Sequence, residues 1–224
     1  MKITKSWFYK SSELISKEVI ILDKLNITIF DDDNSLEKVL VWKNSFLNYF
    51  SYFKKPDSYL KHFITSWEGA EVVINSLLFS KSNEIKANII WEIASNKSKI
   101  DISIICLAAN NSFIDLDWQI QINESLEWVE GYLVEDNVFL WDKAKIRWLP
   151  TLLVRSDDVK ASHACRIEKI SDEKLFYLRS RGILKDNALN MMIESYVVKI
   201  FWNLKELDKV FYKEIIENIL KEIN

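Results

Sequence analysis

The chain has 224 residues, of which 49% are hydrophobic and 28% charged, so it can bury a core and is not a disordered tail. Thirty Lys and Arg against 33 Asp and Glu give a formal charge of −3, without the basic surplus that nucleic-acid binding requires. With three glycines and two prolines, the sequence contains no G-x-G-x-x-G, G-x-x-x-x-G-K-[ST] or G-x-S-x-G motif, which argues against nucleotide-binding loops and nucleophile-elbow hydrolases.

The N-terminus and the cysteines indicate the compartment. Residues 1–10 mix polar and aromatic side chains and lack the apolar run of a signal peptide. The longest apolar stretch, residues 104–109, is far shorter than a membrane span. Cys106 and Cys165 cannot build a disulfide framework. We therefore predict a soluble cytoplasmic protein that binds neither membranes nor nucleic acid.

The stretch from about residue 19 to residue 170 is predicted to be β-structure. Along residues 100–104 and 114–122, apolar and polar side chains alternate, which is typical of strands with one buried face. Further β-branched or aromatic runs occupy residues 26–30, 36–42, 46–53, 72–79, 88–93, 126–134 and 145–154. No Asn-Gly or Asp-Gly turn joins these runs, which favours a β-solenoid over a hairpin barrel.

After Ile170 the hydrophobic period becomes helical. Ser171 can cap a first helix, which has acidic residues in its first turn and ends at Gly182. Asp186 opens a second helix, and a third follows from about Leu207. The sequence thus predicts a β body over residues 1–170 and a C-terminal helical domain over residues 171–224.

A specific motif surrounds this β-to-α junction. Residues 157–163 read D-D-V-K-A-S-H, and residues 176–183 read F-Y-L-R-S-R-G-I. This segment resembles the SufB/SufD family of iron–sulfur cluster assembly proteins, in which D-D-V-K-x-S-H-G-A-T-V-G precedes F-Y-L-R-S-R-G-I. The likeness runs without a gap from Pro150 to about Ala188. Residues 162–164 read Ser-His-Ala where the SufB branch has Glu-His-Glu, so the chain is closer to the SufD branch.

The resemblance implies a mainly β fold, a right-handed parallel β-helix (β-solenoid) with a C-terminal α-helical domain. It also implies a non-catalytic scaffold subunit of a SUF-type complex that builds and transfers nascent iron–sulfur clusters. The expected partners are a SufB-like paralog, or a second copy of this chain, and a SufC-like ABC ATPase. Since the chain is about half the usual family length, we interpret it as a shortened member.

The same resemblance implies that His163 is a metal and cluster ligand. Cys165 departs from the family motif, but it lies two residues further along and could add a thiolate on the same face. In an uninterrupted strand these two residues share a face with apolar neighbours, so they also fit a buried, hydrogen-bonded histidine and a small apolar filler. A neutral imidazole can bind iron when its second nitrogen is anchored. Because iron–sulfur clusters normally take about four cysteines, we expect a transient cluster shared with a partner subunit, and none held by this chain alone.

The helical segment also carries residues suited to docking. Aromatic and arginine side chains are enriched at protein interfaces, and the apolar faces of the second and third helices exceed what a small solenoid needs to cover. We predict that the ATPase binds through Phe176, Tyr177, Arg179, Arg181, Met192 and Tyr196.

Other interpretations stay open. The chain can be a degenerate β-helix with only an architectural or interaction role. Acidic residues such as Asp115, Asp117 and Glu135 could serve a β-helix carbohydrate-active enzyme as acid and base, although a solvated strand face explains Asp115 and Asp117 fully.

Two metal-site hypotheses rest on weaker patterns. A zinc site built from His62, His163, Cys106 and Cys165 matches no usual ligand spacing. The acidic run at residues 31–33 lacks the glycine and terminal glutamate of an EF-hand loop, and we interpret it as a solvated turn.

Overall fold

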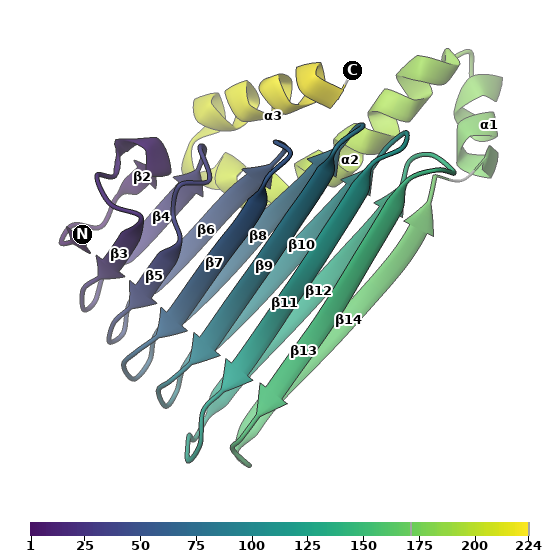
Figure 1. The fold of residues 1–224 in the computed structure, drawn as a ribbon. Helices are drawn as coiled ribbons and strands as arrows, with labels where there is room; N and C mark the ends of the chain where they lie inside the picture. Colours follow the sequence, from purple (N-terminus) through teal and green to yellow (C-terminus); the bar gives the residue numbers. More distant parts are fainter. Residues whose placement is uncertain (171, 224) are drawn as a thin grey trace.

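A computed structural model describes residues 1–170 and 172–223 of the chain. They form two facing sheets of parallel strands, followed by three α-helices (Figure 1). The second and third helices lie against one of the sheets. This confirms the predicted mainly β solenoid with C-terminal helices. Ser171, the predicted helix cap, lies outside the described residues.

The strands alternate between the two sheets along the chain. The first sheet contains β1 (Lys2–Ile3), β3 (Glu18–Ile21), β5 (Lys38–Val41), β7 (Ser58–Thr65), β9 (Glu84–Ile93), β11 (Phe113–Ile122) and β13 (Lys145–Val154). The second sheet contains β2 (Phe8–Lys10), β4 (Asn26–Asp31), β6 (Phe46–Phe53), β8 (Glu71–Ser80), β10 (Lys99–Ala108), β12 (Val129–Phe139) and β14 (Val159–Lys169). Each turn of the solenoid therefore adds one strand to each sheet.

The turns lengthen toward the C-terminal end. Glu18 pairs with Lys38, 20 residues further along, whereas Lys99 pairs with Glu130, 31 residues further along. The strands lengthen with them, from four residues in β3 to eleven in β14. The solenoid is thus widest at its last turn, where β13 and β14 are the edge strands.

The corners between the sheets explain why so few glycines are needed. Lys24, Asn44, Gly69 and Lys97 have left-handed backbone conformations with φ between 52° and 75°. Each of their N–H groups donates to a carbonyl in the corner of the following turn, for example from Lys24 to Lys43. The corner geometry is therefore stabilised by a ladder of backbone hydrogen bonds, and it is adopted largely by residues with a side chain.

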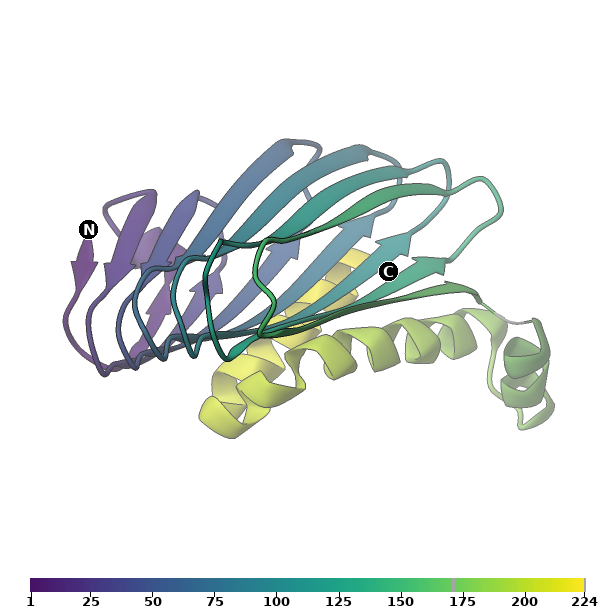
Figure 2. The ribbon, with the colours of Figure 1, turned by 90° about the horizontal axis from the view of Figure 1, so that it is seen from below.

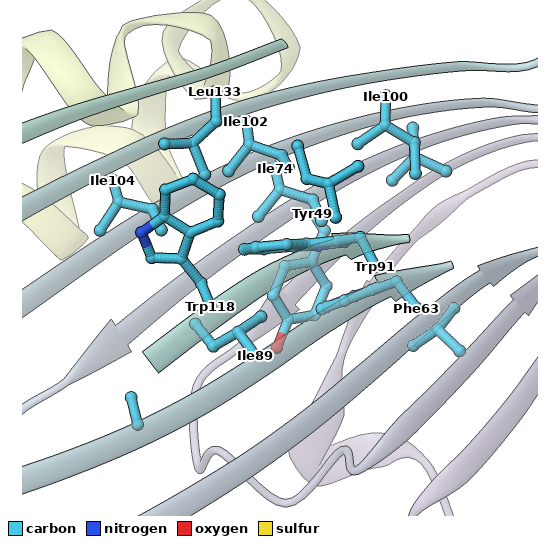
Figure 3. Close-up of a cluster of buried hydrophobic side chains, with 14 of the residues drawn as sticks. Tyr49, Phe63, Ile74, Ile89, Trp91, Ile100, Ile102, Ile104, Trp118 and Leu133 are labelled. Carbon is cyan, nitrogen blue, oxygen red and sulfur yellow. The ribbon is translucent and has the colours of Figure 1, made fainter. Parts of the chain in front are cut away.

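The interior of the solenoid is a continuous apolar core. Inward side chains alternate with outward ones, and the largest fully buried ones include Trp91, Trp118, Tyr49 and Phe63. Figure 3 shows these rings among aliphatic side chains such as Ile102 and Leu133. The period-two pattern of the sequence predicts this inward face correctly.

A second core lies on the outer face of the second sheet. On β10, the outward Asp101 and Ser103 are followed by the buried outward Ile105 and Leu107. The helices α2 (Lys185–Leu207) and α3 (Lys209–Ile223) cover this apolar half of the face (Figure 2). Phe201 of α2 is fully buried there, with its ring near Phe30 and Phe50.

The first helix, α1 (Asp172–Ser180), is different, because none of its residues is buried. It contacts α2 and extends beyond the end of the sheets (Figure 1). Within the part of the chain that the structure describes, no helix is both long and apolar enough to cross a membrane. The division into two domains at residue 170 stays a prediction, although β14 ends at Lys169 and α1 begins at Asp172.

Candidate functional site

The last two turns of the solenoid contain polar side chains in its interior. Glu135 and Asn137 on β12, and His163 and Cys165 on β14, occupy inward positions of their strands. The strand register sets Glu135 beside Cys165. Trp118 on β11 reaches them from the opposite sheet. We call these five residues the interior polar cluster.

Glu135 is the centre of the cluster. Its side chain is fully buried, and its two carboxylate oxygens accept hydrogen bonds from Trp118 Nε1 at 3.0 Å and from Asn137 Nδ2 at 2.6 Å. Burial raises the pKa of Glu135 above its usual value, because removal from water disfavours the charged form. The two hydrogen bonds oppose this shift but do not cancel it. Glu135 is therefore a fixed carboxyl group with a higher proton affinity than a surface glutamate.

His163 lies at the open end of this cluster. Its ring makes an edge contact with Trp118, with 4.7 Å between ring centroids, and its Nε2 is 3.9 Å from Glu135 Oε2. The side chain is 24% exposed, so it is within reach of solvent. Partial burial lowers the pKa of His163. At neutral pH the ring is therefore mainly the neutral imidazole, which is the form that binds metals.

The two cysteines differ in access. Cys165 is exposed, and its Sγ accepts a hydrogen bond from Asn137 Nδ2 at 3.5 Å. Burial of the thiol, followed by the nearby charge of Glu135, raises the pKa of Cys165. Cys106 is fully buried in the apolar core, and burial raises its pKa strongly. Both remain thiols near neutral pH, and of the two only Cys165 can be approached from outside.

The cluster supplies metal donors but not a complete metal site. Imidazole, thiol and carboxyl groups all bind iron or zinc. Among the described residues, however, no group of three or more His, Cys, Asp or Glu side chains is arranged to hold a metal ion. Any metal bound by His163 and its neighbours therefore needs further ligands from elsewhere.

The structure separates the four residues of the zinc hypothesis. His62 lies on the outer face of the first sheet, where its Nε2 is 3.4 Å from Glu92. Cys106 on β10 is fully buried in the apolar core, whereas His163 and Cys165 lie two residues apart on β14. The zinc hypothesis is therefore not supported in the described part of the chain.

The acidic pair Asp115 and Asp117 lies on the solvated face of β11. Arg147 on β13 is 2.5 Å from Asp115 and 3.3 Å from Asp117, so the three form a surface ion-pair network. Neither carboxylate faces the interior polar cluster. The surface explanation of these residues fits the structure better than an acid–base pair does.

The prediction of a solvated turn at residues 31–33 is wrong for Asp31. This carboxylate is fully buried, and Lys61 on β7 donates a hydrogen bond to it at 2.6 Å. Tyr49 also donates to Asp31 through its hydroxyl group. The sequence pattern misses β7 as well, because Lys61 occupies an inward position where alternation calls for an apolar residue.

The predicted docking residues lie in two different environments. Phe176 and Tyr177 on α1 are 72% and 56% exposed, and the guanidinium of Arg181 is 5.1 Å from the Tyr177 ring centre. Arg179 is exposed on the same helix. These four residues form an accessible patch of aromatic and basic side chains, which we call the α1 patch.

Met192 and Tyr196 face the solenoid instead. Both are partly buried on α2 and pack against the second core. Burial, together with a hydrogen bond to Glu168 on β14, raises the pKa of Tyr196. These two residues therefore join α2 to the solenoid, whereas the α1 patch is free for contact with another protein.

Glu135 and Asn137 belong to the interior polar cluster, a placement that the sequence pattern does not predict. Sequence periodicity ends the predicted strand at residue 134, so Glu135 is named there only as a possible acid or base of an enzyme and not as a neighbour of His163 and Cys165. The signal that identifies them is the continued alternation from Val129 through Leu133, which places residues 135 and 137 on the inward face.

The architecture defines a β-solenoid protein with nitrogen, sulfur and oxygen donors gathered at its last turn, and comparison with known proteins identifies the family. Residues 58–196 match the sequence model of the SUF system FeS cluster assembly, SufBD core domain. The chain therefore belongs to the SufB/SufD family, as its β-to-α junction predicts.

Individual relatives place the chain near SufD. It is 27% identical over 143 residues to the iron–sulfur cluster assembly protein SufD of Escherichia coli, covering 62% of this chain and 33% of SufD. It is 33% identical over 88 residues to an iron–sulfur cluster assembly SufBD family protein of Pyrococcus horikoshii, covering 39% of this chain and 20% of the relative. The matched region thus spans about a third of SufD and about a fifth of the archaeal protein.

Proposed function

We propose that this protein is a non-catalytic scaffold subunit that helps to build and transfer nascent iron–sulfur clusters in a SUF-type complex. The observation that carries the proposal is the interior polar cluster, an incomplete set of metal donors at the last turn of the solenoid, where β13 and β14 form its open end. In this function the iron–sulfur cluster is the cargo, and the interior polar cluster supplies part of its ligands. His163 supplies a neutral nitrogen ligand, and Cys165 supplies sulfur once iron displaces its proton.

The proposed cluster is shared with another subunit, because this chain brings fewer donors than an iron–sulfur cluster takes. The last turn of the solenoid is suited to such pairing. Its edge strands β13 and β14 are each paired on one side only, which leaves backbone groups available to a further strand. Large apolar side chains are exposed on these two strands: Leu149, Leu152, Leu153, Val154 and Ile167. A SufB-like paralog, or a second copy of this chain, would cover them.

The α1 patch is the proposed docking surface for a SufC-like ABC ATPase. It combines two exposed aromatic rings with Arg179, on a helix that has no buried residue of its own, and with Arg181 directly after that helix. An ATPase that moves α1 and α2 would act on the last turn of the solenoid, since Tyr196 of α2 is hydrogen-bonded to Glu168 on β14. Replacing Phe176 and Tyr177 together by Asp should abolish co-purification of the ATPase, whereas Trp202→Asp, on an exposed part of α2, should not.

Anaerobic reconstitution with iron and sulfide tests the cluster site. The sample is the complex of this chain with its co-expressed paralog and ATPase, and the readout is cluster absorbance per complex. His163→Ala should remove most of this absorbance. His62→Ala is a matched control, because it removes the other histidine of the chain, which lies on the outer face of the solenoid.

The second candidate function is purely architectural. It is favoured by the finding that the described residues hold no group of three or more potential metal ligands. If the His163→Ala complex assembles normally and keeps its full cluster absorbance, the chain is an interaction module without a ligand role. The right-handed winding and the cytoplasmic location stay predictions from the resemblance and the sequence.

A further inference from the structure

A row of aromatic rings runs through the solenoid interior to the polar cluster. Neighbouring ring centroids are 4.8 Å apart for Tyr49 and Phe63, 6.2 Å for Phe63 and Trp91, and 6.4 Å for Trp91 and Trp118. The row ends at His163, 4.7 Å from Trp118. All four aromatic residues before His163 are at most 2% exposed, and Figure 3 labels them together. The row therefore connects the open end of the solenoid with its buried middle without an intervening aliphatic layer.

Each end of the row is hydrogen-bonded to a carboxylate. At the outer end, Trp118 Nε1 donates a hydrogen bond to Glu135 at 3.0 Å. At the inner end, the Tyr49 hydroxyl donates to Asp31, which also accepts a hydrogen bond from Lys61. Tyrosine is oxidised much more easily when a hydrogen-bonded base accepts its proton in the same step. The phenol of Tyr49 is held in that arrangement.

The middle of the row has no such partner. Trp91 Nε1 is buried and has no hydrogen-bond partner among the described residues. An oxidised Trp91 has no base to which it could lose its proton, so a positive charge there would move on to a neighbouring ring. Phe63 is not itself oxidised, but it lies in contact between Trp91 and Tyr49 and can couple them electronically.

We infer that Trp118, Trp91 and Tyr49 form a conduit that carries one-electron oxidising equivalents away from the His163 and Cys165 end to Tyr49. The oxidant is a species of the hydroxyl-radical or high-valent iron–oxygen class, which peroxide and iron produce. The conduit protects the thiol and imidazole of the interior polar cluster from damage. This inference rests on the proposed function for the iron that generates the oxidant at this end, but its test with a photo-oxidant needs no iron.

The electrons and protons balance as follows. The oxidant gains one electron from Trp118, Trp118 regains one from Trp91, and Trp91 regains one from Tyr49 through Phe63. Tyr49 loses its hydroxyl proton to Asp31 and becomes a neutral tyrosyl radical. A low-molecular-weight thiolate later supplies one electron to the row and becomes a thiyl radical, while Asp31 returns the proton to Tyr49.

The conduit can be tested in the isolated chain with a photo-oxidant. A ruthenium polypyridyl complex is attached to Cys165, which is accessible, whereas Cys106 is fully buried. After a laser flash and oxidative quenching, transient absorption and electron paramagnetic resonance should detect a neutral tyrosyl radical. Its formation should be slower in deuterated water, because proton transfer to Asp31 accompanies the oxidation.

Three variants decide the outcome. Tyr49→Phe should abolish the tyrosyl signal, and Trp91→Phe should lower its yield at least tenfold while retaining an aromatic ring. Trp67→Phe is the control for Trp91→Phe, because Trp67 is exposed and outside the row. Circular dichroism verifies that each variant is folded. A tyrosyl signal that survives Tyr49→Phe, or a yield that is the same in Trp91→Phe and Trp67→Phe, would overturn the inference.

Discussion

Lys199 on α2 donates a hydrogen bond to the buried carboxylate of Asp136, the residue that directly follows Glu135 on β12. Glu135 faces the interior polar cluster, and Asp136 faces the helix, since neighbouring residues of a strand point to opposite sides. Arg166, which follows Cys165 on β14, lies 3.6 Å from the same Asp136 carboxylate. The adjacent strands β12 and β14 thus connect the contact between Lys199 and Asp136 with the proposed ligand residues His163 and Cys165.

Lys199→Met should destabilise the protein. Asp136 is nearly fully buried and would keep only the distant Arg166 as a charged partner, which we expect to cost about 1–2 kcal/mol. Denaturant unfolding measures the change. Asp136→Asn should restore much of the loss in the double variant, because it removes the buried charge that has lost its hydrogen bond to Lys199. Lys97→Met, which breaks an exposed ion pair with Glu68, is the control and should leave stability unchanged.

Glu135→Gln should change how stability depends on pH. Because burial raises the pKa of Glu135 in the folded state, the wild-type protein loses stability as the pH rises from the unfolded-state pKa of about 4.3 through the folded-state pKa. The amide does not titrate. Relative to the wild type, the variant should therefore gain stability across that interval and keep the gain at higher pH. Urea unfolding of both proteins between pH 4 and pH 8 measures the difference; a constant difference over that range would contradict the prediction.

Lys24→Gly should stabilise the protein. Lys24 has φ 59° at a corner of the solenoid, a conformation that costs an L-residue with a side chain about 1–2 kcal/mol. Glycine avoids that cost but loses more chain entropy on folding, so we expect a net gain of about 0.5–1 kcal/mol. Thermal unfolding measures it. Lys38→Gly, in the extended strand β5, should lower stability instead.

Phe201→Ala should weaken the attachment of the helices. Phe201 is fully buried between α2 and the second sheet, and truncation of such a ring costs about 3–5 kcal/mol. The next residue, Trp202, is 49% exposed and provides a matched control. Trp202→Ala should have a much smaller effect on the free energy of unfolding. Equal losses in the two variants would contradict the proposed second core.

Part of the candidate site follows from the sequence alone. The motif around His163 identifies the family, and alternation along β14 places His163 and Cys165 on the same face. Alternation cannot show that Glu135 lies beside Cys165, because the turns of the solenoid vary between 18 and 32 residues in length. The same limit hides the buried pair of Asp31 and Lys61, which are 30 residues apart.

The sequence by itself determined the strand-rich body, the change to helices after Ile170 and the family, because these depend on local periodicity and on contiguous motifs. Only the tertiary structure decided which side chains meet across turns. It brought Trp118 and Glu135 to His163, placed Lys199 on Asp136 and covered half of the second sheet with α2 and α3. The physical reason is that period-two alternation sets the face of a residue, whereas its neighbours depend on strand register, which the variable corners and backbone hydrogen bonds determine together.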